Sequence, residues 1–192
     1  MASIMTTTPM SGFILAGGQS TRMGRDKALL DWHGIPLLNH MVALLEHATN
    51  DVKVVGRDHL PDRLPGCGPL SGIETALTIT STENNLIVAV DLPLLTKDFL
   101  QFFRRTSERS TRAVLACKIG SQFPLCLGIK RVVLEQVRER LARRDLSIHG
   151  FIESADPEIL SEAQLRDGGF ESSIFKNLNT PEDYERNSGT DV

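Results

Sequence analysis

The fold follows from residues 12–27, which read GFILAGGQSTRMGRDK. Residues 12–16 are apolar and predict a β-strand, and the strand runs directly into a glycine-rich loop over residues 17–27. Paired glycines after a strand allow a ligand to approach the backbone closely, and they leave amides free to donate to phosphate oxygens. Three cations lie in the same loop: Arg22, Arg25 and Lys27. Together these features predict a cradle for a polyphosphate.

Two better-known phosphate loops are excluded by the spacing. A P-loop needs G-x-x-x-x-G-K-[ST], whereas Lys27 follows Asp26 and precedes Ala28, and G-x-G-x-x-G is absent.

Along the rest of the chain, short runs of β-branched apolar residues alternate with longer stretches in which apolar residues recur with the period of a helix. Strands are expected over residues 52–55, 86–90, 113–116, 124–129 and 173–175. Helices are expected over residues 36–48, 69–80, 97–105 (with Thr96 as N-cap), 132–144, 148–152 and 180–186. Residues 86–90 are apolar throughout, as in the middle of a covered parallel sheet. The pattern predicts an α/β fold, a single three-layer domain with a mostly parallel central sheet and helices on both faces.

Composition narrows the class of function. A chain of 192 residues with 41% hydrophobic residues and a net charge of −3 fits one domain without a broad basic surface. We therefore expect neither nucleic acid nor a membrane as a partner. No C-x-x-C pair occurs among the three cysteines, Cys67, Cys117 and Cys126. The first residues lack the charged start and the long apolar stretch that are typical of a leader peptide. A cytoplasmic location fits these features best.

Asp91 follows the most apolar strand, at the edge of the sheet where ligands bind. A carboxylate beside a phosphate cradle would repel its ligand unless a divalent cation lay between them, and Mg²⁺ favours one or two carboxylates plus phosphate oxygens. Asp91 is thus the predicted metal ligand. The alternative is an aspartate that only caps the turn before Pro93.

Two further segments offer polar groups to a ligand. Gly68 and Gly72 flank Pro69 at a predicted helix start, and upstream Asp62 could accept two N–H bonds from the N1/N2 edge of guanine. Asn177 and Asn179 point the same way on an extended segment, although Asn179 could simply turn the chain. Asp62 lies in a Pro/Gly-rich loop, where an exposed side chain with no ligand is the simpler interpretation.

Other polar residues are not predicted to form a site. Helix 132–144 carries a solvated basic face that includes Arg138 and Arg140; Arg143 and Arg144, near the helix end, could reach a phosphate. His40 and His47 are too far apart along a helix to share a metal ion. The cysteines have no evident activating partner, so a covalent mechanism has little support.

Four segments in order resemble the molybdenum cofactor guanylyltransferases, which have the nucleotide-diphospho-sugar transferase (Rossmann-like) fold. They are LAGGQSTRMGRDK (15–27), GPLSGI (68–73), DLP (91–93) and NLNTPED (177–183). The resemblance implies a Mg²⁺-dependent nucleotidyltransferase that moves GMP from GTP to the terminal phosphate of molybdopterin or molybdenum-loaded molybdopterin, with release of pyrophosphate. It also implies transient contact with a pterin-delivery protein and a molybdoenzyme chaperone.

The resemblance also implies roles for individual residues. Catalysis would fall to Arg22, Lys27 and Asp91, with Asp91 as the metal ligand. The nucleotide would be held by Leu15, Ala16, Gly17, Gly18, Lys27, Asp62, Gly68 and Asp91. The pterin would be bound by Gly72, Asn177 and Asn179.

The chain departs from the family pattern in two places. Gly56 stands where some relatives place a nucleotide-contacting asparagine, and the loop between Asp62 and Gly68 is one residue shorter than in some. We expect one nucleotidyltransferase domain over residues 10–187 between mobile tails, 1–9 and 188–192. The alternatives are a cytidylyltransferase, another nucleotidyltransferase acting on a phosphorylated acceptor, and a GTP-binding regulator without turnover.

Overall fold

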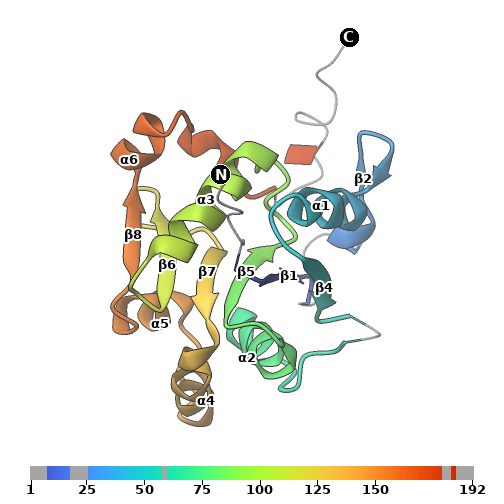
Figure 1. Cartoon of the computed structure of the whole chain (residues 1–192). Coiled ribbons are helices and arrows are strands. Elements are labelled where there is room, and N and C mark those ends of the chain that lie inside the picture. The colour runs from blue at the N-terminus through green and yellow to red at the C-terminus, as the bar shows by residue number, and fades with distance from the viewer. Residues whose placement is uncertain (1–7, 18–25, 58–59, 179–182, 185–192) are drawn as a thin grey trace, which may run out of the picture.

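The computed structural model describes residues 8–17, 26–57, 60–178 and 183–184. Within them, six strands form one sheet in the order β4-β1-β5-β7-β6-β8 (Figure 1). These strands are β1 (Met10–Leu15), β4 (Asp51–Val55), β5 (Asn84–Ala89), β6 (Val114–Lys118), β7 (Cys126–Lys130) and β8 (Glu158–Ser161). A separate hairpin pairs β2 (Asp31–Trp32) with β3 (Ile35–Pro36).

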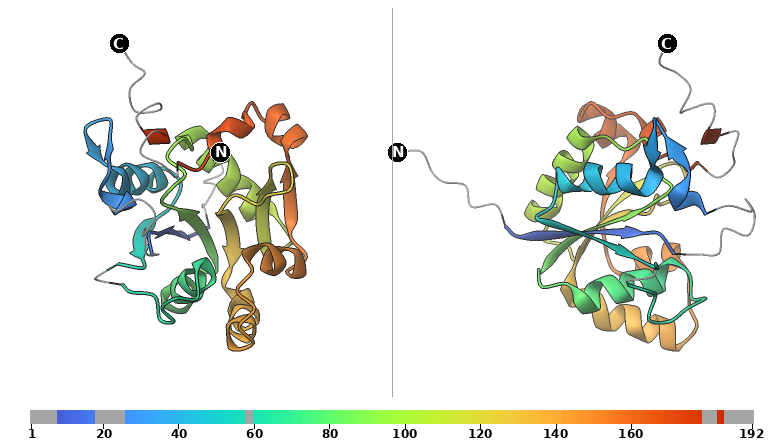
Figure 2. Two further views of the ribbon diagram at one scale, coloured as in Figure 1. Left: turned by 180° about the vertical axis from the view of Figure 1, so that it is seen from behind. Right: turned by 90° about the vertical axis from the view of Figure 1, so that its right-hand side faces the viewer.

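Helices cover both faces of this sheet, as Figure 2 shows when the sheet is seen edge-on. The helices are α1 (Leu37–Glu46), α2 (Pro69–Ile79), α3 (Lys97–Arg109), α4 (Leu134–Ala142), α5 (Ile148–Ser154) and α6 (Glu162–Asp167), with 3-10 turns η1 (Lys27–Leu29), η2 (Arg131–Val133) and η3 (Ser172–Phe175). One apolar core joins the sheet to α1, α3 and α6, and a second joins it to α2, α4 and α5. The predicted three-layer α/β architecture is therefore confirmed.

The order of the strands follows from their connections. Strand β1 pairs in parallel with both β4 and β5, each of which is reached through a helix. Strand β7 is antiparallel to both neighbours, β5 and β6. The segment between β6 and β7 is too short for the crossover that a parallel pair needs, so the chain turns back on itself.

Helix starts follow local chemistry. The Thr96 side chain accepts a hydrogen bond of 3.2 Å from the amide of Phe99, as the sequence predicts for an N-cap. The fully buried Phe99 and Phe103 of α3 then pack against the sheet. Every helix in the described part of the chain falls short of a transmembrane span in length or in hydropathy.

The sequence-based prediction is wrong near the C-terminus. Residues 173–175 belong to the 3-10 turn η3, because the amide of Lys176 bonds the carbonyl of Ser173 and Phe175 packs edge-on against Phe99 at 5.0 Å between ring centroids. The outer edge of the sheet is instead occupied by β8, which pairs with β6. Of the helix predicted over residues 180–186, only residues 183–184 lie within the described part of the chain, and these two are helical.

Candidate active site

Three loops meet at one edge of the sheet because β4, β1 and β5 are parallel neighbours. Leu15 is in register with both Val55 and Ala89. Two further hydrogen bonds extend the pairing past the strands: the amide of Ala16 donates to the carbonyl of Val55 at 2.9 Å, and that of Val90 to Leu15 at 3.1 Å. The loops that follow these strands, far apart in sequence, therefore begin side by side.

Lys27 and Asp91 come from two of these loops and lie close together. The Lys27 Nζ is 3.9 Å from Asp91 Oδ2, with side chains 20% and 24% exposed. Burial raises the pKa of Asp91, and the positive charge of Lys27 partly offsets that rise. The chain thus holds a desolvated carboxylate beside an ammonium group at the carboxyl edge of the sheet.

The start of η1 fixes Lys27 locally. The Asp26 side chain caps this 3-10 turn by accepting from the amide of Ala28 at 3.1 Å, and its other oxygen pairs with Arg57 in the loop after β4. Arg57 was missed by the sequence analysis. The available signal was its position just beyond the end of β4, because a cation that follows this strand lies at the same edge of the sheet as Lys27.

The Asp91 loop is held from two further directions. The amide of Leu178 donates to the Asp91 carbonyl at 3.2 Å, which places the exposed Asn177 next to this loop. His40 Nε2 donates to the carbonyl of Pro93 at 3.1 Å. Burial lowers the pKa of His40, against the opposing effect of that hydrogen bond, so the imidazole is neutral near pH 7. The histidine on α1 therefore supports the loop.

Asp62 lies deeper than its loop composition suggests. It is half-buried, and burial raises its pKa. A Cβ built on Gly17 would lie 2.9 Å from Asp62 Oδ2, and one built on Gly72 would lie 3.5 Å from Asp62 Oδ1. The carboxylate thus sits between the end of β1 and the first turn of α2, which corrects the expectation of an exposed side chain.

Gly56 explains one departure from the family pattern. Its φ is +88°, and a Cβ there would lie 2.4 Å from the Cα of Gly17. Because backbone meets backbone at this point, a larger residue cannot fit unless one of the two loops moves.

We expect Gly56→Ala to lower the free energy of unfolding by about 3 kcal/mol, since a left-handed φ costs about 1–2 kcal/mol with a Cβ and overpacking about 1–3 kcal/mol. Urea denaturation measures this loss. Gly34→Ala is the matched control: Gly34 has a φ of +86°, but nothing lies within 4 Å of its added Cβ. Equal losses in the two variants would show that the contact with Gly17 carries no weight.

Other predicted residues fall in different places. Ala16 uses its amide to bond the carbonyl of Val55, so that amide is not available to a phosphate. Gly68 is the N-cap of α2 with a φ of 65°, and Gly72 is buried against Leu15. Gly18, Arg22 and Asn179 lie outside the described residues.

The basic face of α4 is less solvated than predicted. The side chain of Arg138 pairs with Glu74 at 3.1 Å, and that of Arg140 with Asp145 at 2.7 Å. Arg143 is exposed and lies 3.8 Å from Glu139 one turn away. Buried Cys117 and Cys126 have raised thiol pKa values, because burial disfavours the thiolate, so neither is an activated nucleophile.

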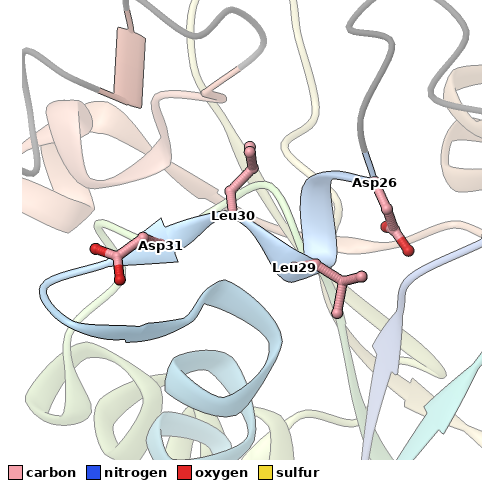
Figure 3. A pocket seen from close by; sticks show the side chains of 4 residues that line it. All are labelled: Asp26, Leu29, Leu30 and Asp31. Atoms are coloured by element: carbon pink, nitrogen blue, oxygen red, sulfur yellow. The ribbon is translucent and has the colours of Figure 1, made fainter.

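A hollow of about 350 Å³ is lined by Asp26, Leu29, Leu30 and Asp31. Figure 3 shows the two carboxylates at opposite ends of this segment, with the leucines between them. Asp26 is engaged by Arg57 and Ala28, and Asp31 accepts from the amide of Gly34 at 3.2 Å. Two carboxylates would repel a phosphate, so this hollow does not suit a triphosphate.

The donor set suits a magnesium ion shared with a ligand. Among the described residues, no three His, Cys, Asp or Glu side chains gather into a group that could hold a metal by themselves. The lone carboxylate of Asp91 fits Mg²⁺ all the same, since that ion commonly takes one or two carboxylates and completes its shell with phosphate oxygens and water. A cation would also compensate the charge that burial destabilises at Asp91.

Comparison with known proteins places the chain in a family. The model of the MobA-like NTP transferase domain matches residues 12–157. A probable molybdenum cofactor guanylyltransferase from Carboxydothermus hydrogenoformans is 35% identical, with 90% of this chain and 92% of that protein covered. The molybdenum cofactor guanylyltransferase of Xanthomonas euvesicatoria is 32% identical, with 93% and 94% covered.

Solved structures share the fold. Molybdopterin-guanine dinucleotide biosynthesis protein A from Archaeoglobus fulgidus superposes with a TM-score of 0.81 at 21% identity, over 94% of this chain and 97% of that one. A 2-C-methyl-D-erythritol 4-phosphate cytidylyltransferase from Thermus thermophilus gives 0.63 at 12% identity, over 92% and 96%. The resemblance seen in the sequence is confirmed: this chain belongs to the family of the MobA-like NTP transferase domain.

Proposed function

We propose that this chain transfers GMP from GTP to the terminal phosphate of molybdenum-loaded molybdopterin, releasing pyrophosphate and forming the guanine dinucleotide cofactor. Its family and the names of relatives that it matches over almost their whole length support this proposal. The observation that carries it is the 3.9 Å approach of Lys27 and Asp91 where the loops of three parallel strands meet.

The reaction needs little from the protein beyond position and charge. An oxygen of the acceptor phosphate attacks the α-phosphorus of GTP, a new P–O bond forms, and the bond to the bridging oxygen of pyrophosphate breaks. The acceptor phosphate is already ionised near pH 7, so no general base is required. The barrier lies in bringing anions together and in stabilising the charge on the leaving pyrophosphate.

Cations and amides supply that stabilisation in our proposal. Lys27 and Arg22 neutralise the triphosphate, and the amides from Gly17 onward donate to its oxygens. Leu15 and Ala16 form the strand end beneath the nucleotide. Gly68, at the start of α2, lets the backbone approach the nucleotide.

Asp91 would hold a magnesium ion, which when bound polarises the α-phosphate and lowers its repulsion of the incoming acceptor. The positive charge of Lys27, 3.9 Å from the carboxylate, favours the ionised form of Asp91, which is the form that binds a cation. Mg²⁺ is the ion that we propose at Asp91.

The base and the pterin are recognised at separate places. The Asp62 carboxylate, between Gly17 and Gly72, accepts from the donor edge of guanine. Asn177 and Asn179 bind the pterin in this proposal; the bond from the Leu178 amide to the Asp91 carbonyl, which brings Asn177 next to the Asp91 loop, supports it. Gly72 supports binding indirectly, by letting α2 pack against Leu15. A cytoplasmic location and contacts with a pterin-delivery protein and a molybdoenzyme chaperone remain predictions.

The test is a transfer assay with purified protein, molybdopterin and one nucleotide at a time. With GTP and Mg²⁺ we expect the guanine dinucleotide and one pyrophosphate per product, identified by mass spectrometry and phosphate release. CTP should give little product, and chelation of Mg²⁺ should stop the reaction. Preference for CTP would instead make the chain a cytidylyltransferase, and GTP binding without product would make it a regulator.

A further inference from the structure

Helix α2 carries polar side chains on a side that is buried. Ser71 and Thr75 are fully buried, and Glu74 is 4% exposed. Their spacing of three and four residues puts them on one helix face. Buried hydroxyl and carboxylate groups lower stability unless they find partners. The partners include the two residues that follow Asp62.

Each of these side chains contacts the loop directly. The amide of Arg63 donates to Thr75 Oγ1 at 3.1 Å, and the amide of Leu64 donates to Ser71 Oγ at 3.2 Å. The Arg63 guanidinium lies 3.7 Å from Glu74. Helix α2 therefore holds the loop through two successive backbone amides and one ion pair.

The Thr75 hydroxyl has a fixed direction. Its own proton goes to the carbonyl of Ser71, one turn back in the helix, at 3.0 Å. The hydroxyl oxygen then offers only a lone pair to the Arg63 amide, so it acts as the acceptor in that hydrogen bond. A β-branched side chain also has few alternative rotamers in a helix, which further limits its movement.

The residue directly before Arg63 is Asp62, whose carboxylate faces Gly17 and Gly72. Among the described residues, none donates a hydrogen bond to that carboxylate. The side chain is therefore placed by its backbone and by packing against the two glycines. A shift of the Arg63 amide would move the acceptor oxygens relative to a bound base.

We propose that Thr75 is a positioning residue for base selectivity: it holds the Arg63 amide so that both oxygens of Asp62 meet the two donors on the guanine edge. This inference rests on the proposed function, in which Asp62 reads guanine. Ser71 acts in the same way through Leu64, one residue further from the carboxylate.

Isothermal titration of the full chain with GTP and with inosine triphosphate, each with Mg²⁺, tests the proposal. Inosine lacks the exocyclic amine and so offers Asp62 one donor instead of two. We expect the wild type to prefer GTP by about 20-fold, since losing a hydrogen bond to a charged group weakens binding by about 10- to 100-fold.

Thr75→Val keeps the shape of the side chain but removes the acceptor for Arg63. The preference for GTP should fall to about threefold or less, mainly through weaker binding of GTP. Thr75→Ser keeps the hydroxyl and should retain most of the preference. If both Thr75 variants keep the wild-type preference while GTP and inosine triphosphate weaken equally, Thr75 only stabilises the fold and the proposal is overturned.

Two further variants make the result decisive. Thr106→Val is the matched control, because the Thr106 hydroxyl makes the same backbone bond, to Phe102 at 3.0 Å, on α3 away from this loop. It should leave the preference unchanged. Ser71→Ala removes only the bond to Leu64, so it tests the same idea if Thr75→Val does not fold; an unchanged preference in Ser71→Ala would then overturn the proposal.

Asp62→Asn separates this inference from the proposed function. If the wild type prefers GTP and Asp62→Asn loses that preference while Thr75→Val keeps it, Asp62 reads the base and only the positioning role fails. If the wild type does not discriminate between the two nucleotides, or Asp62→Asn discriminates as well as the wild type, the assignment of Asp62 in the proposed function fails as well.

Discussion

Asp91→Asn should reduce GMP transfer about a thousandfold, equivalent to about 4 kcal/mol in the activation free energy. The substitution keeps the size of the side chain but removes the charge that would hold a magnesium ion at the α-phosphate. The fold should remain intact, because the variant no longer carries a carboxylate whose ionised form burial disfavours. Turnover of product per enzyme and the urea midpoint measure the two effects.

Two observations make that result interpretable. Asp98→Asn is the matched control, since Asp98 is an exposed carboxylate in the first turn of α3. It should transfer GMP like the wild type. Electron paramagnetic resonance of Mn²⁺ in the presence of GTP reads metal binding directly, and Asp91→Asn should weaken it. Wild-type turnover in Asp91→Asn would refute the metal-holding role.

Lys27→Met should lower kcat/KM for GTP about 100-fold, because a charged hydrogen bond to phosphate contributes about 1.5–3 kcal/mol. Methionine fills a similar volume without the charge. Steady-state kinetics at varied GTP concentration measures the loss. Lys97→Met is the control, since Lys97 is exposed at the start of α3. A variant Lys27→Met with an unchanged kcat/KM would show that the triphosphate does not bind beside this lysine.

The two substitutions should not be additive. Lys27 and Asp91 are separated by only 3.9 Å, and groups in direct contact commonly show interaction energies of about 0.5–3 kcal/mol. Without the lysine, the Asp91 carboxylate loses the positive charge that partly offsets its raised pKa. Comparing the double variant with both single variants therefore measures how far the ammonium group prepares the carboxylate for a cation.

Much of the site could be predicted because parallel strands share an edge. Each strand with its following loop has a local signature, and the apolar run before Asp91 marks the centre of the sheet. Once β1 and β5 are taken as parallel neighbours, the loops that contain Lys27 and Asp91 must begin side by side. The structure confirms that Lys27 and Asp91 lie close together, and the family match confirms the resemblance on which the residue roles depend.

The missed elements had weak or misread local signals. Strand β8 is short and mixes Glu158 with apolar residues, so its pattern resembles a loop, and only pairing with β6 makes it a strand. Helix α6 did carry a signal: Ser161 and Gln164 form a capping box, visible in the sequence as S-x-x-Q. Ser173 and Phe175 alternate like a strand, but the buried Phe175 ring packs against Phe99 from a 3-10 turn.

The sequence by itself determined the α/β class and the neighbouring positions of Lys27 and Asp91, because these depend on local periodicity and on the geometry of parallel strands. Only the tertiary structure decided where the Asp62 carboxylate lies, why Gly56 must lack a side chain, and which loop amides Thr75 and Ser71 hold. Those features depend on contacts between segments distant in sequence, and no local pattern reports which buried hydroxyl will meet which amide.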